Sequence, residues 1–253
     1  MKVCVLASGS KGNCVYIDSN GTKLLMDVGI SNIQVEKRLN EINVNSSDID
    51  AVFITHTHSD HINGLKVFAK KNNAKIYMRE KAYQEVKDLL PININFINDE
   101  IVINDTVIKT IKTSHDATDS VSYLVEDMNS SCVYMTDTGY IKQKNLNQIK
   151  NKDIYIFESN HDIEMLLNGE YPYHLKQRIL GDSGHLSNKD SAVYMTKLLG
   201  DNTKKVILFH LSDKNNTKKL ALETYEEVFK NHDIEIPNII VAEQNEVSEL
   251  IEV

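Results

Sequence analysis

Short apolar segments separated by turn-forming residues dominate the first third of the chain, and this pattern predicts β-strands. The predicted strands cover residues 2–7, 14–18, 23–27, 51–54 and 75–78. Helices are expected between them, because apolar residues recur there at helical spacing. The predicted helices cover residues 31–40 behind a Ser31 cap, residues 60–71, and residues 80–90, where Pro91 stops the helix.

Three later strands are each followed by a side chain that can bind a metal ion. The apolar or alternating segments 106–114, 131–136 and 205–209 lead to His115, Asp137 and His210. Rigid strands that deliver ligands from their ends to one edge of a sheet make a preorganised site. One such residue alone could be a capping aspartate or a structural histidine, but several in one chain indicate a shared site.

The densest group of candidate ligands is the segment Thr55–His61, with the sequence THTHSDH, directly after the apolar run 51–54. Imidazole nitrogen and carboxylate oxygen are preferred ligands of zinc and similar divalent ions. On an extended backbone His56, His58 and Asp60 would point to one side, and a turn into the following helix would redirect His61. Two ions therefore suit this loop better than one. The alternative is a polar loop with several histidines, or an adventitious metal-binding patch.

Composition is that of an ordinary soluble globular protein with one sizeable core. The chain has 253 residues, of which 41% are hydrophobic and 25% charged. Cys4, Cys14 and Cys132 are odd in number and lack C-x-x-C spacing, so we expect reduced core thiols in a cytoplasmic protein. We expect no signal peptide and no membrane-spanning segment. A net charge of −8 argues against a generic nucleic-acid coat but does not exclude a nuclease.

The order H-x-H-x-D-H, His, Asp, His resembles the metallo-β-lactamase fold, and Asp27 matches the first motif of that fold. The resemblance implies an α/β (α+β) fold, a four-layer αββα sandwich, as a single domain over residues 1–253 with a small cap segment at about 159–188. It also implies two divalent ions, zinc or manganese. One ion would be held by His56, His58 and His115, the other by Asp60, His61 and His210, with Asp137 bridging the two.

A finer resemblance is to the WalJ (YycJ) branch of this superfamily, whose members are similar to nucleases. Residues 7–13 (ASGSKGN), 159–162 (SNHD) and 184–188 (GHLSN) carry it, and the last of these is also similar to ribonuclease Z. The branch implies a phosphodiesterase acting on nucleic acid, with DNA a more probable substrate than RNA, and most specifically a 5′-to-3′ DNA exonuclease. The implied catalytic residues are Asp60, Asp137, His185 as general acid, and Glu158 orienting His185.

Several of these residues have a second interpretation. Asp27 could order the ligand loop or be a plain turn aspartate. His185, just before a helix predicted from the S-x-x-D capping pattern at Ser187, could be a structural histidine instead of an acid. His161 is open between a functional and a structural role. The glycine-rich loop 8–13 could present its backbone N–H groups or Lys11 to the substrate, or simply turn the chain.

Two other functions compete with the nuclease. The same ligand set could hydrolyse small esters or thioesters, as in glyoxalase II and lactonases, or the chain could be a non-enzymatic regulatory module linked to a cell-wall two-component system. The complete ligand set argues against the second of these. Lysines after the strand ends, above all Lys142 and Lys214, favour a phosphate-bearing substrate. The sequence leaves oligomeric state open and predicts no membrane partner.

Overall fold

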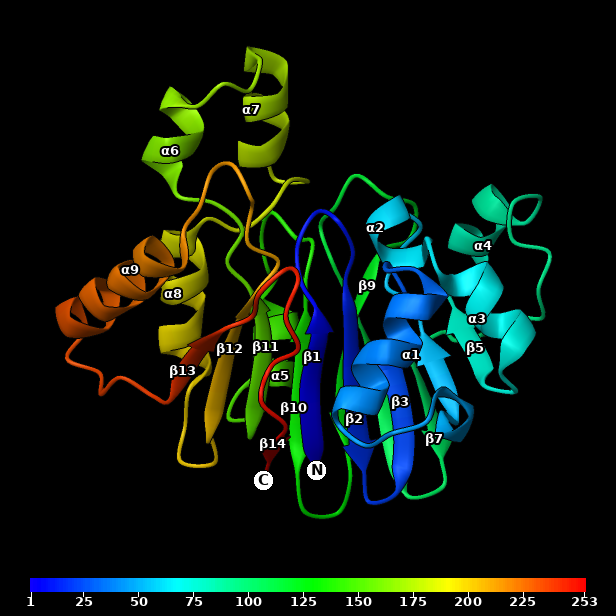
Figure 1. Ribbon diagram of the computed structural model, residues 1–253. Helices are drawn as coiled ribbons and strands as arrows, with labels where there is room; N and C mark the ends of the chain where they lie inside the picture. The colour runs from blue at the N-terminus through cyan, green and yellow to red at the C-terminus, as the bar shows by residue number, and fades with distance from the viewer. The chain divides into compact units, whose positions relative to one another are not determined.

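The computed structural model describes residues 1–253, which form nine α-helices and fourteen strands (Figure 1). The strands belong to two mixed β-sheets. The chain divides into two compact units. The first contains residues 1–111, 117–130 and 243–253, and the second contains residues 112–116 and 131–242.

The first unit is built on a complete seven-stranded sheet. Its strand order is β14 (Ile251–Glu252), β1 (Lys2–Ala7), β2 (Cys14–Ser19), β3 (Thr22–Met26), β4 (Ala51–Phe53), β5 (Lys75–Met78) and β6 (Asn95–Phe96). The strands β3 to β6 are parallel to one another. Because parallel strands end at the same edge of a sheet, Asp27 after β3 and the ligand loop after β4 start side by side.

Helices cover one face of this sheet (Figure 1). They are α1 (Asn32–Glu41), α2 (Ser59–Ile62), α3 (Leu65–Lys71) and α4 (Glu80–Val86). Leu39 and Phe68 on the helices are buried in one core cluster with Leu6 and Val52 of the sheet. Ser31 caps α1, as the sequence predicts, and also forms a capping box with Gln34.

Three more strands of the first unit belong to the other sheet: β7 (Glu100–Ile103), β8 (Thr106–Lys112), of which only Lys112 lies in the second unit, and β9 (Val121–Glu126). The rings of Phe53 in β4 and Tyr123 in β9 pack edge to face at 5.5 Å between centroids. The Tyr123 hydroxyl donates to the carbonyl of Ile54 at 2.6 Å. These contacts join the inner faces of strands from the two sheets.

The second unit has four parallel strands in the order β10 (Ser131–Met135), β11 (Ile154–Glu158), β12 (Lys205–Phe209) and β13 (Ile239–Val241). Every residue of β10, β11 and β12 is buried. The carboxyl ends of these three strands therefore meet at one edge, and they lead directly to Asp137, Glu158 and His210. Among the helices, α8 (Asn188–Leu198) and α9 (Lys218–Asn231) bury an apolar face, as does α5 (Gln143–Ile149).

The predicted cap segment contains α6 (Ile163–Asn168) and α7 (Tyr173–Leu180), which project from the rest of the second unit (Figure 1). Pro172 stands at the N-cap of α7, and no residue of α7 is buried. The three cysteines are buried and unpaired, and burial raises the pKa of the Cys4 thiol to about 11. None of the helices is long and apolar enough to cross a membrane.

Two predicted helices differ from the structure. Residues 60–71 form two helices, α2 and α3, because the helix is interrupted at Gly64. The Gly64 N–H donates to the Val28 carbonyl at 2.9 Å. A β-carbon at Gly64 would lie 2.0 Å from the Ile30 carbonyl oxygen, so the close approach requires glycine. The helix predicted over 80–90 ends at Val86, followed by a turn in which Leu90 bonds back to Val86.

Candidate active site

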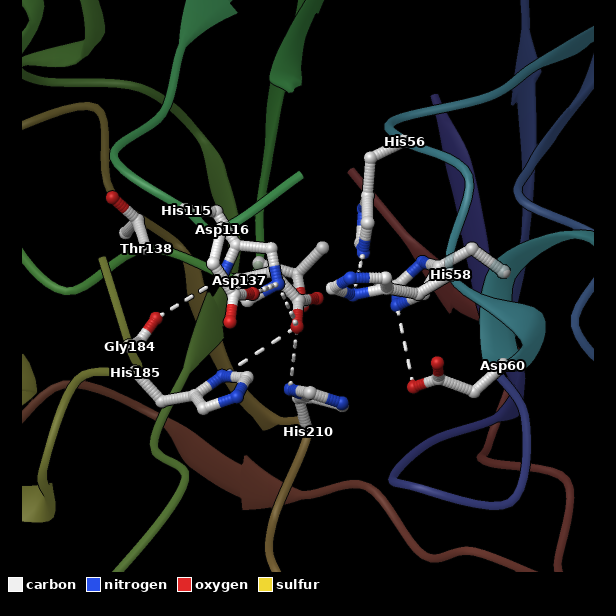
Figure 2. Close-up of polar contacts among 12 residues, drawn as sticks. His56, His58, Asp60, His115, Asp116, Asp137, Thr138, Gly184, His185 and His210 are labelled. Carbon is white, nitrogen blue, oxygen red and sulfur yellow. Dashed lines mark hydrogen bonds and ion pairs between the residues drawn. The ribbon is translucent and has the colours of Figure 1, made fainter. Parts of the chain in front are cut away.

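The first unit gathers four predicted ligands on the loop after β4. His56 follows the strand, His58 is the N-cap of α2, and Asp60 and His61 lie within α2. Nε2 of His56 is 3.1 Å from Nδ1 of His58 (Figure 2). Nε2 of His61 is 3.5 Å from a carboxylate oxygen of Asp60. The rings of His56 and His61 are 4.1 Å apart at their centroids. The sequence motif thus becomes a compact set of nitrogen and oxygen donors.

Asp27 holds this loop in place through hydrogen bonds to both of its ends. One carboxylate oxygen accepts from Nδ1 of His61 at 2.8 Å, and the other accepts from the Thr55 backbone N–H at 2.8 Å. The Thr55 hydroxyl lies 2.9 Å from Asp27 and 3.0 Å from Nδ1 of His56. Asp27 and His61 are fully buried. Of its two interpretations, Asp27 therefore has the contacts of a residue that orders the ligand loop.

The second unit gathers a group of residues around Asp137. Its Oδ1 lies 3.5 Å from Nδ1 of His185, 3.5 Å from Nδ1 of His210 and 3.7 Å from Nε2 of His115 (Figure 2). Nδ1 of His115 donates to the Gly184 carbonyl at 3.2 Å. Ligand atoms of Asp137, Glu158, His185 and His210 lie within 4.8 Å of one another.

The side chain of Glu158 lies at the centre of this group and accepts four hydrogen bonds. Its Oε1 accepts from Nδ1 of His185 at 2.8 Å and from Nδ1 of His210 at 3.0 Å. Its Oε2 accepts from the backbone N–H groups of Thr138 at 3.0 Å and Leu186 at 3.3 Å. Burial opposes the ionised form, but the charge and hydrogen bonds of His185 and His210 outweigh it and lower the pKa of Glu158. The predicted contact with His185 is present, whereas sequence reasoning missed the contact with His210.

Three residues at strand ends adopt left-handed backbone conformations. The φ angles are +60° at Asp27, +53° at Asp137 and +58° at His210. Such angles are uncommon for residues other than glycine and concentrate at functional sites. The turn at each strand end directs the side chain toward its group of polar partners. The preference of Asp and Asn for this region is the only sequence signal that could have indicated it.

The donor set fits a divalent metal centre. Metal-bound histidines usually donate their second ring N–H to a carboxylate or carbonyl. His61, His115 and His210 each have Nδ1 on such an acceptor, namely Asp27, Gly184 and Glu158. In each of these three residues, Nε2 is therefore the ring nitrogen that could coordinate an ion. The chemistry is that of zinc or another borderline ion with imidazole and carboxylate ligands.

His161 lies near this group but has a different character. It is 1% exposed, and neither ring nitrogen hydrogen-bonds to another part of the protein. Burial, followed by the charge of His185, lowers its pKa to about 4. His161 is therefore neutral at physiological pH, and its backbone carbonyl accepts the N–H of Asn188 at the start of α8.

Comparisons with known proteins agree with this fold and site. The model of the β-lactamase superfamily domain matches residues 22–211. Exodeoxyribonuclease WalJ of Streptococcus pneumoniae strain D39 is 41% identical over 87% of this chain and 85% of its own length. Exodeoxyribonuclease YycJ of Bacillus anthracis is 38% identical over 89% of this chain and 88% of its own.

Among solved structures, the metallo-β-lactamase fold protein YhfI from Bacillus subtilis has a TM-score of 0.74 at 16% identity, covering 98% of this chain and 99% of that one. The predicted fold class, an α/β metallo-β-lactamase sandwich, is confirmed. The predicted resemblance to the WalJ branch is confirmed as well. The chain belongs to the β-lactamase superfamily and, within it, to the family of WalJ and YycJ.

Proposed function

We propose that this protein is a metal-dependent phosphodiesterase that degrades DNA as a 5′-to-3′ exonuclease. The observation that carries the proposal is the placement of His185, which Glu158 holds beside Asp137. Cleavage of a phosphodiester expels a strongly basic oxygen, which leaves more readily when an acid gives it a proton. A thiolate leaves without such help, so the arrangement favours the phosphodiester over the thioester alternative. The two bacterial relatives named as exodeoxyribonucleases support DNA as the substrate.

We propose that the seven predicted ligands hold two divalent ions, zinc or manganese. His56, His58 and His115 would bind one ion, Asp60, His61 and His210 the other, and Asp137 would bridge them. Support comes from the donor chemistry of the two residue groups and from membership of the superfamily. When bound, the ions would activate a water molecule for attack on phosphorus and neutralise charge on the phosphate oxygens.

The side chains supply the remaining chemistry. Since Nδ1 of His185 donates to Glu158, the proton for the leaving oxygen comes from Nε2 of His185. The Glu158 carboxylate stabilises the protonated ring, and its pKa below the ordinary value keeps it ionised. His185 is partly exposed, with 18% of its side chain accessible, so a substrate can reach it. Asp60 and Asp137 orient the reacting groups as carboxylates.

Lysines near the ligand-bearing strand ends would attract the DNA backbone. Lys142 stands at the N-cap of α5, shortly after Asp137. Lys214 follows His210 and is exposed, 3.7 Å from a carboxylate oxygen of Glu170. Lys205, at the start of β12, is buried and donates to the Asn238 side chain at 3.0 Å, so it does not belong to this group. Phosphate contacts of this kind make binding salt-dependent.

The test uses metal-reconstituted protein on three substrates: bis-p-nitrophenyl phosphate, duplex DNA labelled at the 5′ or the 3′ end, and a glutathione thioester. We expect cleavage of both phosphodiesters, with 5′ label released as mononucleotides while 3′ label remains on shortening strands. Release of 3′ label first would overturn the polarity. Turnover of the thioester alone would establish the small-molecule alternative, and inactivity on all three with metals bound would favour the regulatory one.

A further inference from the structure

The loop between β1 and β2, residues 8–13, ends in an asparagine that contacts two predicted ligands. The backbone N–H of Asn13 donates to the Asp60 carbonyl at 2.8 Å. Its side-chain Nδ2 lies 3.3 Å from a carboxylate oxygen of Asp60 and 3.1 Å from Nε2 of His61. Asn13 is fully buried, and its Oδ1 accepts the N–H of Gly9 at 2.8 Å, which fixes the orientation of the amide.

These contacts are on the coordinating side of the ligands. Nδ1 of His61 is bound to Asp27, so Nε2 is the atom left for a metal ion, and the Asn13 amide lies next to it. The Asp60 side chain is 21% exposed, so part of its surface reaches solvent. Asn13 restrains both the backbone and the carboxylate of Asp60. The loop therefore contacts the predicted ligands Asp60 and His61 and does more than reverse the chain direction.

The C-terminal segment, residues 243–253, holds this loop in place. Oε1 of Gln244 accepts the backbone N–H of Lys11 at 3.1 Å, and its Nε2 lies 3.4 Å from the Gly12 carbonyl, to which it donates. The Gln244 side chain thus binds two neighbouring backbone groups of the loop, the N–H of Lys11 and the carbonyl of Gly12. Gly12 has a φ of +146°, a conformation that side-chain-bearing residues rarely adopt, so the loop shape depends on glycine at this point.

The C-terminal segment is itself anchored at the loop contact and beyond it. Arg38 is 7% exposed and donates to the carbonyls of Leu6 at 2.6 Å, Gln244 at 3.4 Å and Asn245 at 3.3 Å. Further along, Ser248 exchanges two hydrogen bonds of 2.9 Å with the backbone of Val5 in β1. Gln244 is therefore held against a strand of the sheet, and not at the end of a loose tail.

We propose that Asn13 and Gln244 are positioning residues for the ion bound by Asp60 and His61. Gln244 fixes the loop 8–13, and Asn13 transmits that position to the two ligands. This inference rests on the proposed function, because it takes Asp60 and His61 as ligands. Residues that orient metal ligands typically change metal affinity by about 10–100-fold when removed. The C-terminal segment is thus part of the metal centre although it supplies no ligand.

The test measures metal affinity on the full chain. Metal-free protein is titrated with Zn²⁺ in competition with a chromophoric chelator, for wild type, Asn13→Ala, Gln244→Ala and the double variant. We expect one of the two zinc affinities to fall about 10–100-fold in Asn13→Ala. In Gln244→Ala the affinity for the same ion should fall by a smaller factor. If Gln244 acts through Asn13, the double variant should be no worse than Asn13→Ala alone.

Gln143→Ala and Asn147→Ala are matched controls, since they remove the same amide groups from an exposed pair on α5. Gln244→Glu keeps the acceptor for Lys11 but loses the donor to Gly12, so its loss should lie between wild type and Gln244→Ala. Thermal melting of the metal-free variants shows whether they are folded. If Asn13→Ala does not fold, Gln244→Ala still tests the inference, because Gln244 is partly exposed.

Each result has one meaning. Two zinc ions bound to wild type with unchanged affinity in Gln244→Ala would overturn the inference and leave the proposed function standing. Losses in the double variant that equal the product of the single losses would show that Gln244 acts independently of Asn13. Wild-type protein that takes up no zinc or manganese would instead refute the proposed metal centre.

Discussion

Asp27 and His61 form a fully buried pair in which the carboxylate accepts the ring Nδ1–H at 2.8 Å. The pair joins the end of β3 to the first turn of α2, two elements that are far apart in the sequence. Because the same carboxylate also accepts the Thr55 N–H, a single side chain sets both the start of the ligand loop and its last histidine.

Replacing Asp27 with alanine should lower metal affinity by about 10–100-fold, because His61 loses the acceptor that fixes its orientation. Asp27→Asn keeps one acceptor oxygen and should lose less. Chelator competition on the purified variants measures both effects. Asp50→Ala provides a control, since the Asp50 side chain accepts the Lys23 backbone N–H through an exposed contact. Equal affinities for wild type and Asp27→Ala would show that the pair serves the fold alone.

His185→Ala should lose about 10²–10⁴-fold of the rate on DNA, because the leaving oxygen would depart without a proton. It should retain bound metal and much of its rate on bis-p-nitrophenyl phosphate, whose leaving group is acidic enough to depart unprotonated. Steady-state rates on both substrates, with elemental analysis, check this. The exposed His174→Ala is the control. Equal losses on both substrates would leave His185 as a phosphate-binding or structural residue.

Local patterns in the sequence predicted much of the fold and the polar side chains that follow each strand. The apolar runs before His56, Asp137 and His210 are continuous, and buried strands produce that signal directly. Short edge strands such as β6 and β14 have too few residues to form a pattern. They exist because a longer neighbour offers them hydrogen bonds.

Contacts between distant residues were harder to predict. Glu158 binds His210 from 52 positions away, and Asn13 reaches Asp60 from 47 positions away. Neither contact leaves a periodic trace in the sequence, since each depends on how strand ends and loops pack. A family resemblance can predict the metal ligands by matching motif positions one by one. It does not identify the residues that orient those ligands.

Gly29→Ala should destabilise the protein and disturb the ligand loop. A β-carbon there would lie 1.7 Å from the Asp60 carbonyl oxygen and 2.6 Å from the Asn13 nitrogen, so the backbone must move. We expect a loss of about 2 kcal/mol or more in the free energy of unfolding, together with weaker metal binding. Urea denaturation of metal-free protein and a zinc titration measure the two effects.

Gly181→Ala is the matched control for Gly29→Ala, because its nearest neighbour would be 3.2 Å away, at the Gln177 carbonyl. If Gly29→Ala proved as stable as Gly181→Ala and bound zinc normally, the close approach of residues 29 and 60 would not constrain the site.

The buried His161 should make the protein less stable in mild acid. Its pKa is about 4 when folded and about 6.5 when unfolded, chiefly because burial opposes the charged form. Well above pH 6.5 the ring is neutral in both states and contributes no pH dependence. As the pH falls from 6.5 toward 4, only the unfolded state gains the proton, so the free energy of unfolding decreases. Between pH 7.5 and pH 5 the loss should be about 2 kcal/mol.

Urea denaturation of metal-free wild type and His161→Leu at both pH values isolates this contribution. The variant should lose about 2 kcal/mol less than wild type over the same interval, because leucine does not titrate. His174→Ala, which removes an exposed histidine, should behave like wild type. Carboxylates with lowered pKa values, such as Glu158, lose their stabilising effect only at lower pH, so they do not contribute to this difference. Identical losses in wild type and His161→Leu would mean that His161 takes up a proton as readily in the folded state as in the unfolded one.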